Sequence, residues 1–351
     1  MNRPEITRRH EALLSQLESA KSEHSPELAA FIGRRLRETD LLLCFLDLRE
    51  DPTGAQAYAR YRQLVGELYG SFDAQIVQGV LGYLKDQAAR TNTMQQYEEV
   101  VSAINVKPAQ GMYRPSPEDF QYYRQLLLTS DHPLRQLAEQ PLPDDYRDRT
   151  AILGLFEWAL QTVGAKAEEW RLREKPHGSN VMISRHKQEV ILGDHYTPHT
   201  AERLRQIVGH EVCIHVRRVL LQQHHQSAQT EEGVALLAEQ LLAPQFGYKR
   251  LVRYLAGALA WGVDGKPRTF SETFAIVWRV FMIIAKTNEQ EAKQRAFKEC
   301  VRIFRGGIPE VPGAAFIKDK VYLEANLTVW QGLSRDKLNQ AEFLRLLDGY
   351  Q

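Results

Sequence analysis

The segment His210-Glu211-Val212-Cys213-Ile214-His215 constrains the fold more than any other part of the chain. It places two histidines five residues apart in a stretch from Thr197 to Gln222, and the helix-start pair Thr197-Pro198 and the pattern after it predict one helix there. At 3.6 residues per turn, five residues rotate the second side chain by roughly 140° from the first. A π-type turn, with hydrogen bonds from i to i+5, would bring the two imidazoles together. The sequence therefore predicts a π-type distortion between Gly209 and His215.

Short apolar runs before this helix predict a small sheet. Residues 180–184 and 189–192 contain β-branched side chains, and the polar residues 185–188 between them favour a hairpin. Residues 169–173 alternate as a strand does, and residues 232–242 predict a helix that stops near a proline. Strands, then a helix with histidines, then a helix with acids is an order found in zinc peptidases. In those proteins a small sheet lies above the metal helix, and its edge can pair with an extended peptide.

The rest of the chain is mostly helical in pattern. Residues 5–95 place apolar side chains at three- and four-residue spacing, with a turn predicted at residues 51–54, and Ser116-Pro117 is a helix-start signal. The cluster Gln140-Pro141-Leu142-Pro143 marks a boundary. We expect an α+β, mostly helical fold with two parts. These are a helical N-terminal region at 1–145 and a zincin-like catalytic domain at 146–351, with a small sheet above a metal-binding helix.

The residue types around the two histidines are those of a catalytic zinc site. Two neutral imidazoles and one carboxylate, with one position left open, form a standard set for catalytic Zn²⁺. His210 and His215 supply the imidazoles, and Glu231 or Glu232 supplies the carboxylate from a predicted helix that begins 16 residues after the second histidine. We expect Glu211 to stay off the metal and to act as the base. It would take a proton from the attacking water and return it to the leaving amine.

These motifs resemble those of the tyrosine carboxypeptidase family. That family includes animal enzymes that remove the C-terminal tyrosine of α-tubulin and bacterial proteins with a QEGLA motif. The pattern His-Glu-x-x-x-His at 210–215 and Glu-Glu-Gly-Val-Ala at 231–235 matches its metal motifs. Two later segments, FRGG at 304–307 and GAAFIKDKVYLEA at 313–325, match a further block, and the resemblance covers roughly residues 170–330.

The resemblance implies a role for each residue of the metal motifs. The zinc ligands would be His210, His215 and Glu232, with Glu211 as the catalytic glutamate. Glu231 would orient a ligand histidine through its free ring N–H, or would replace Glu232 as the third ligand.

A carboxypeptidase also needs a cation that holds the free carboxylate of its substrate. Lys318, in the family-like block, is the preferred candidate, although Ile317 before it stands where the family usually has threonine. Arg218 and Arg305 are the other candidates. Arg218 could equally pair with an acid of the fold, and Arg305 could cap a helix C-terminus. Tyr322 could donate a hydrogen bond to the developing oxyanion, or be a half-buried tyrosine of a strand.

The activity that the resemblance implies is the release of a C-terminal, tyrosine-like aromatic residue from a peptide or protein tail. Two alternatives stay open. One is a zinc endopeptidase or amidase that matures a peptide in a biosynthetic pathway, and the other is a non-catalytic helical interaction protein that retains the motif. Microtubule binding is not supported, because the chain has no long basic tail or charge-clustered extension.

Composition limits the partners and the compartment. The net charge of +1 favours neither nucleic acid nor an anionic membrane surface, and the longest apolar stretches are too short to span a bilayer. The chain has three scattered cysteines, and its N-terminus lacks the apolar core of a signal peptide. We therefore expect a cytoplasmic protein without nucleic-acid or membrane partners.

Overall fold

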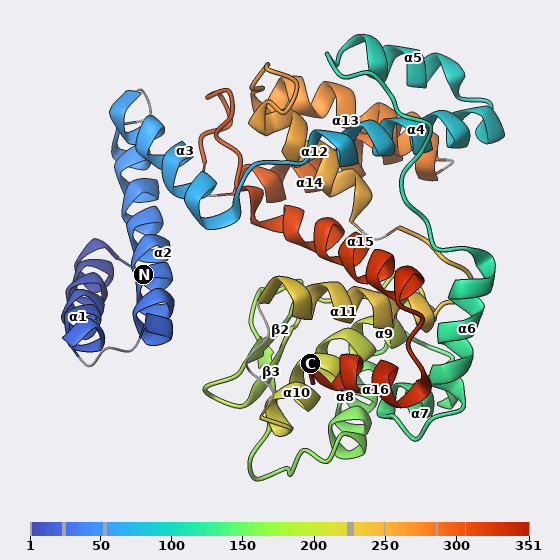
Figure 1. Ribbon diagram of the computed structural model, residues 1–351. Helices are drawn as coiled ribbons and strands as arrows, with labels where there is room; N and C mark the ends of the chain where they lie inside the picture. The colour runs from blue at the N-terminus through green and yellow to red at the C-terminus, as the bar shows by residue number, and fades with distance from the viewer. Residues whose placement is uncertain are drawn as a thin grey trace. The chain divides into compact units, whose positions relative to one another are not determined.

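The computed structural model is mostly helical and has one three-stranded sheet, which confirms the predicted α+β class (Figure 1). It describes residues 2–22, 26–51, 55–222, 228–248, 250–285, 287–305 and 307–350. Three residues of the turn predicted at 51–54, and Gly306 of the FRGG segment, lie outside these ranges. None of the helices in the described ranges is long and apolar enough to cross a membrane.

The chain divides into two compact units, each built from two separate segments. Unit 1 comprises residues 1–112 and 250–320, and unit 2 comprises residues 113–249 and 321–351. The expected division into 1–145 and 146–351 stays a prediction.

All the regular secondary structure among the described residues of unit 1 is helical. Its helices are α1 (Arg3–Ser22), α2 (Pro26–Glu50), α3 (Ala55–Tyr69), α4 (Ala74–Thr91), α5 (Met94–Ser102), α12 (Leu251–Trp261), α13 (Phe270–Ala285), α14 (Glu289–Ile303) and the short 3₁₀ turn η2 (Ile317–Asp319).

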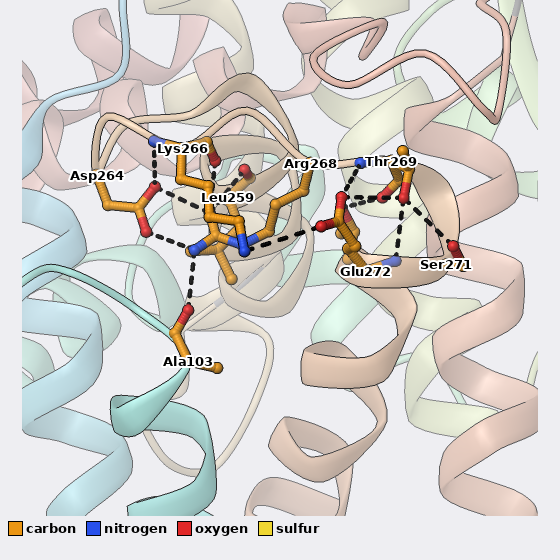
Figure 2. Close-up of polar contacts among 9 residues, drawn as sticks. Ala103, Leu259, Asp264, Lys266, Arg268, Thr269, Ser271 and Glu272 are labelled. Atoms are coloured by element: carbon orange, nitrogen blue, oxygen red, sulfur yellow. Dashed lines mark hydrogen bonds and ion pairs between the residues drawn. The ribbon is translucent and has the colours of Figure 1, made fainter.

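A buried ion pair ties the loop between α12 and α13 to the rest of unit 1 (Figure 2). The guanidinium of Arg268 pairs with Asp264 at 2.5 Å, and both side chains are almost fully buried. Arg268 also donates to the carbonyl of Ala103 just after α5, and Asp264 accepts from the backbone N–H of Asn105. This loop is therefore held by charge-assisted hydrogen bonds to a segment far away in the sequence.

Unit 2 contains the sheet and the remaining helices. These elements are α6 (Pro117–Leu128), α7 (Pro133–Glu139), α8 (Arg149–Thr162), β1 (Arg171–Lys175), β2 (Val181–Ser184), β3 (Glu189–Gly193), α9 (Ala201–Val208), the π-helix η1 (Gly209–Val216), α10 (Arg217–Leu220), α11 (Ala228–Leu241), α15 (Lys320–Arg335, whose first residue belongs to unit 1) and α16 (Gln340–Asp348). The helix start predicted at Ser116 is confirmed, because its hydroxyl accepts from the backbone N–H of Asp119 at 2.9 Å.

The sheet has the strand order β1-β3-β2. β2 and β3 form the predicted antiparallel hairpin, with Ser184 opposite Glu189, and β1 pairs with β3 in parallel. β3 is buried because it lies in the middle, whereas β2 is an edge strand that contacts η1. An edge strand of the sheet thus lies next to the helix that carries the histidines.

The helix that carries the histidines runs without a break through α9, η1 and α10. Its start was predicted at Thr197-Pro198 and is three residues later, where the hydroxyl of Thr200 accepts from the N–H of Arg203. The π-type distortion predicted between Gly209 and His215 is confirmed, because η1 spans Gly209–Val216. Apolar side chains from α9, η1 and α11 lie in the core of unit 2, and Val219 and Leu220 of α10 pack against it.

Candidate metal centre

The π-helix brings the two histidines together. Their ring centroids are 5.0 Å apart, and both side chains are buried. Gly209, immediately before His210, allows this part of the helix to pack closely, since a Cβ there would lie 2.6 Å from a methyl carbon of Leu242 on the chain after α11. The extra residue in the turn therefore brings both imidazoles onto one face of the helix, as the spacing predicted.

Glu232 of α11 has one carboxylate oxygen next to both histidines. Its Oε2 lies 3.4 Å from Nε2 of His210 and 3.7 Å from Nε2 of His215. A tetrahedral zinc with bonds of about 2.0–2.1 Å separates neighbouring ligand atoms by about 3.3 Å. This oxygen is also buried and has no hydrogen-bond partner. Buried polar atoms are normally satisfied, so the arrangement of these three atoms fits a shared cation.

Glu211 lies close to both histidines. One oxygen of its carboxylate and one nitrogen from each histidine all lie within 4.8 Å of one another, in a group that could hold a metal ion. Glu211 is half-buried, and burial raises the pKa of its carboxyl. A carboxylate that binds protons more readily than usual suits a general base.

The far nitrogen of each histidine ring faces a carboxylate. Nδ1 of His215 lies 2.5 Å from Oε1 of Glu231, as expected for a residue that orients a ligand. Nδ1 of His210 lies 2.9 Å from Oε1 of Glu239, a fully buried residue that the sequence analysis missed. The sequence does indicate this position, because Glu239 follows Glu232 by seven residues and therefore lies two turns further along the same helix face.

The electrostatics of the site favour added positive charge. Burial alone would lower the pKa of each imidazole, but the surrounding carboxylates outweigh it and raise the pKa of His210 to about 9 and that of His215 to about 10. Burial alone would raise the pKa of Glu231, but His215 and Arg185 together lower it to about 2. The pKa of Glu232 is likewise lowered by the two histidines against the effect of burial.

A count of charges leads to the same conclusion. Four carboxylates, those of Glu211, Glu231, Glu232 and Glu239, surround the histidines, and two guanidinium groups, those of Arg185 and Arg203, pair with them. When these six groups are ionised and both imidazoles are neutral, as they must be to bind a metal, two negative charges are left, which one divalent cation would neutralise.

α11 is fixed in place by α15. A Cβ on Gly233 would lie 2.7 Å from the carbonyl oxygen of Ala325, so the two helices cross closely next to Glu232. Oε1 of Gln240 on α11 accepts hydrogen bonds from Asn326 at 2.9 Å and from Trp330 at 2.8 Å. This buried network holds the helix that carries three of the glutamates.

Arg218 and Tyr322, two of the other predicted site residues, lie in unit 2. Arg218 is buried and donates to the carbonyls of Leu346 and Leu347 at the C-terminal end of α16. Tyr322 is half-buried on α15, a helix and not a strand.

Two further candidates, Lys318 and Arg305, lie in unit 1. Lys318 is exposed on η2. Arg305 pairs with Asp319 at 3.1 Å, and its guanidinium stacks over the ring of Phe316.

The fold and the site together define the class of protein. It is an α+β protein with a buried histidine–glutamate group that could hold a metal ion. The family model described as microtubule-associated tyrosine carboxypeptidase matches residues 107–347, which is more than half of the chain. The chain therefore belongs to this family, which confirms the resemblance found in the sequence and supports a hydrolase activity of the tyrosine carboxypeptidase type. No curated protein and no solved structure matches the chain.

Proposed function

We propose that this protein is a zinc-dependent carboxypeptidase with a zincin-like catalytic arrangement. The proposal depends above all on the position of Glu232 Oε2, 3.4 and 3.7 Å from the two histidine Nε2 atoms. Family membership supports the reaction type, and the edge strand β2 next to the π-helix supports the binding of an extended peptide.

Three residues would hold the metal: His210, His215 and Glu232. When bound, Zn²⁺ supplies positive charge that lowers the pKa of water to about 7 and polarises a carbonyl group. Glu211 would accept the proton of the attacking water on a carboxylate oxygen. It would then transfer this proton to the nitrogen of the leaving residue, so that one carboxylate serves first as base and then as acid.

The proposed substrate is a peptide or protein tail that ends in an aromatic, tyrosine-like residue. We assign recognition of its terminal carboxylate first to Lys318, whose side chain is exposed, with Arg305 and Arg218 as the other candidates. Tyr322 would donate a hydrogen bond to the oxyanion. These assignments make Lys318→Gln a specific test, because it should raise KM for peptides with a free C-terminus and leave the zinc content unchanged.

The primary experiment compares the wild type with Glu211→Gln. Bound metal is measured by elemental analysis, and both proteins are incubated with a peptide library read by mass spectrometry. We expect about one zinc per chain in both, as a three-ligand site requires, and loss of a single C-terminal residue in the wild type only. Internal fragments would instead indicate an endopeptidase. A wild type without zinc after reconstitution would refute the metal site.

A further inference from the structure

Each histidine of the candidate metal centre begins a chain of side-chain contacts, which passes through a glutamate and ends at an arginine. In the first chain, His210 contacts Oε1 of Glu239 at 2.9 Å, and Oε2 of Glu239 pairs with Arg203. Glu239 is fully buried, whereas the side chain of Arg203 is 24% exposed. Arg203 lies in the first turn of α9 and also donates to Gln206, so its direction is set by two acceptors.

The second chain has the same order but a different environment. His215 contacts Oε1 of Glu231 at 2.5 Å, and the same oxygen accepts from Arg185 at 2.5 Å. Arg185 lies in the turn between β2 and β3, and its side chain is 47% exposed. This chain therefore links the edge strand of the sheet to the histidine.

The two arginines are important because the glutamates that they contact must hold the histidine rings in position. A carboxylate on Nδ1 fixes the rotation of an imidazole ring and directs Nε2 toward the site. A buried carboxylate without enough counter-charge is costly, and Arg203 supplies that charge to Glu239. Oε2 of Glu239 is thus held by Arg203, which leaves Oε1 at 2.9 Å from Nδ1 of His210.

We propose that Arg203 and Arg185 are positioning residues of the metal site, which act on the histidines through Glu239 and Glu231. The inference rests on the proposed zinc site and extends it to two residues that do not touch the metal. Arg203 has the larger effect, because it acts on a fully buried carboxylate, whereas solvent screens the more exposed Arg185.

The test measures metal affinity and does not depend on activity. Purified metal-free wild type, Arg203→Gln and Arg185→Gln compete for zinc with a chromophoric chelator. Arg135→Gln is the matched control, since Arg135 forms a surface pair with Glu139 at 3.0 Å in the same unit. We expect about 10- to 100-fold weaker zinc binding for Arg203→Gln, a smaller loss for Arg185→Gln, and no change for the control.

A second readout separates positioning from a structural role. If Arg203 only stabilised the fold, its replacement would lower the urea midpoint of the metal-free protein, and the folded variant would bind zinc like the wild type. That result would overturn the inference. If Arg203→Gln does not fold, Arg185→Gln decides, because the more exposed Arg185 can be replaced without disturbing the core of unit 2. Zinc affinity lower than that of the control supports positioning, and wild-type affinity refutes it.

The two proposals fail in different ways. A wild type that binds no zinc overturns the metal site itself. A wild type that binds zinc, together with variants that bind it equally well, overturns only the role of the arginines.

Discussion

Replacing Gly233 with alanine tests how closely α11, which carries Glu232, is packed. The added Cβ would lie 2.7 Å from the carbonyl oxygen of Ala325 and 2.8 Å from its carbonyl carbon. Because both atoms belong to the backbone of α15, no side-chain rotation can remove the clash. One of the two helices must shift, and Glu232 is the residue next to the substitution.

The expected magnitude is a balance of two effects. Alanine is a better helix former than glycine and would stabilise a helix interior by about 1 kcal/mol. Forcing an extra carbon into a well-packed contact costs about 1–3 kcal/mol. The site leaves no room for the new carbon, so we expect the upper part of that range and a net loss of about 1–2 kcal/mol in the free energy of unfolding.

Gly332→Ala is the matched control. Gly332 lies in α15, and a Cβ there would meet nothing within 4 Å, so this variant should be more stable than the wild type by up to about 1 kcal/mol. Urea unfolding followed by circular dichroism gives both values, and chelator competition gives the zinc affinity. We expect Gly233→Ala to lose both stability and affinity. A Gly233→Ala protein as stable as Gly332→Ala would show that the close crossing of α11 and α15 does not restrict the residue at 233.

Two further predictions concern charged groups away from the metal centre. Burial alone would raise the pKa of Asp348, but His132 and Arg217 lower it from 3.8 to about 2. Ionised Asp348 therefore stabilises the fold above about pH 4, and this stabilisation is lost as the pH falls toward 2. Urea unfolding at several pH values should therefore show Asp348→Asn less stable by about 2 kcal/mol at pH 7, with a gap that narrows in acid; a constant gap would contradict this. Arg268→Met should cost about 3–5 kcal/mol, because it leaves Asp264 buried without its guanidinium, and Asp264→Asn in the same chain should recover part of that loss.

The sequence predicted those features that depend on local spacing. The five-residue interval between His210 and His215 is incompatible with a shared face on a regular helix, which is why the π-helix could be expected. The β-branched runs and the polar link between them likewise predicted the hairpin of β2 and β3, because its signal lies in neighbouring residues of the sequence.

Features without a periodic or punctuated signal were harder to predict. α12, Leu251–Trp261, is buried on most sides, so its sequence shows no alternation between apolar and polar faces. The start of α9 was placed three residues too early because Thr197-Pro198 and Thr200 are both plausible signals within four residues. Only the hydrogen bond from the N–H of Arg203 identifies the second threonine as the cap.

The candidate metal centre shows where sequence reasoning ends. Its proposed ligands lie on two helices, and each motif is readable because its members are close in sequence along one helix. The groups proposed to orient these ligands can be recognised in the same way only when they share a helix, as Glu239 shares α11 with Glu232. Arg185 and Arg203 come from a hairpin turn and from another helix, so no spacing in the sequence relates them to the glutamates they hold. A motif therefore predicts the candidate ligands of a metal, whereas the three-dimensional fold decides which residues lie in position to orient them.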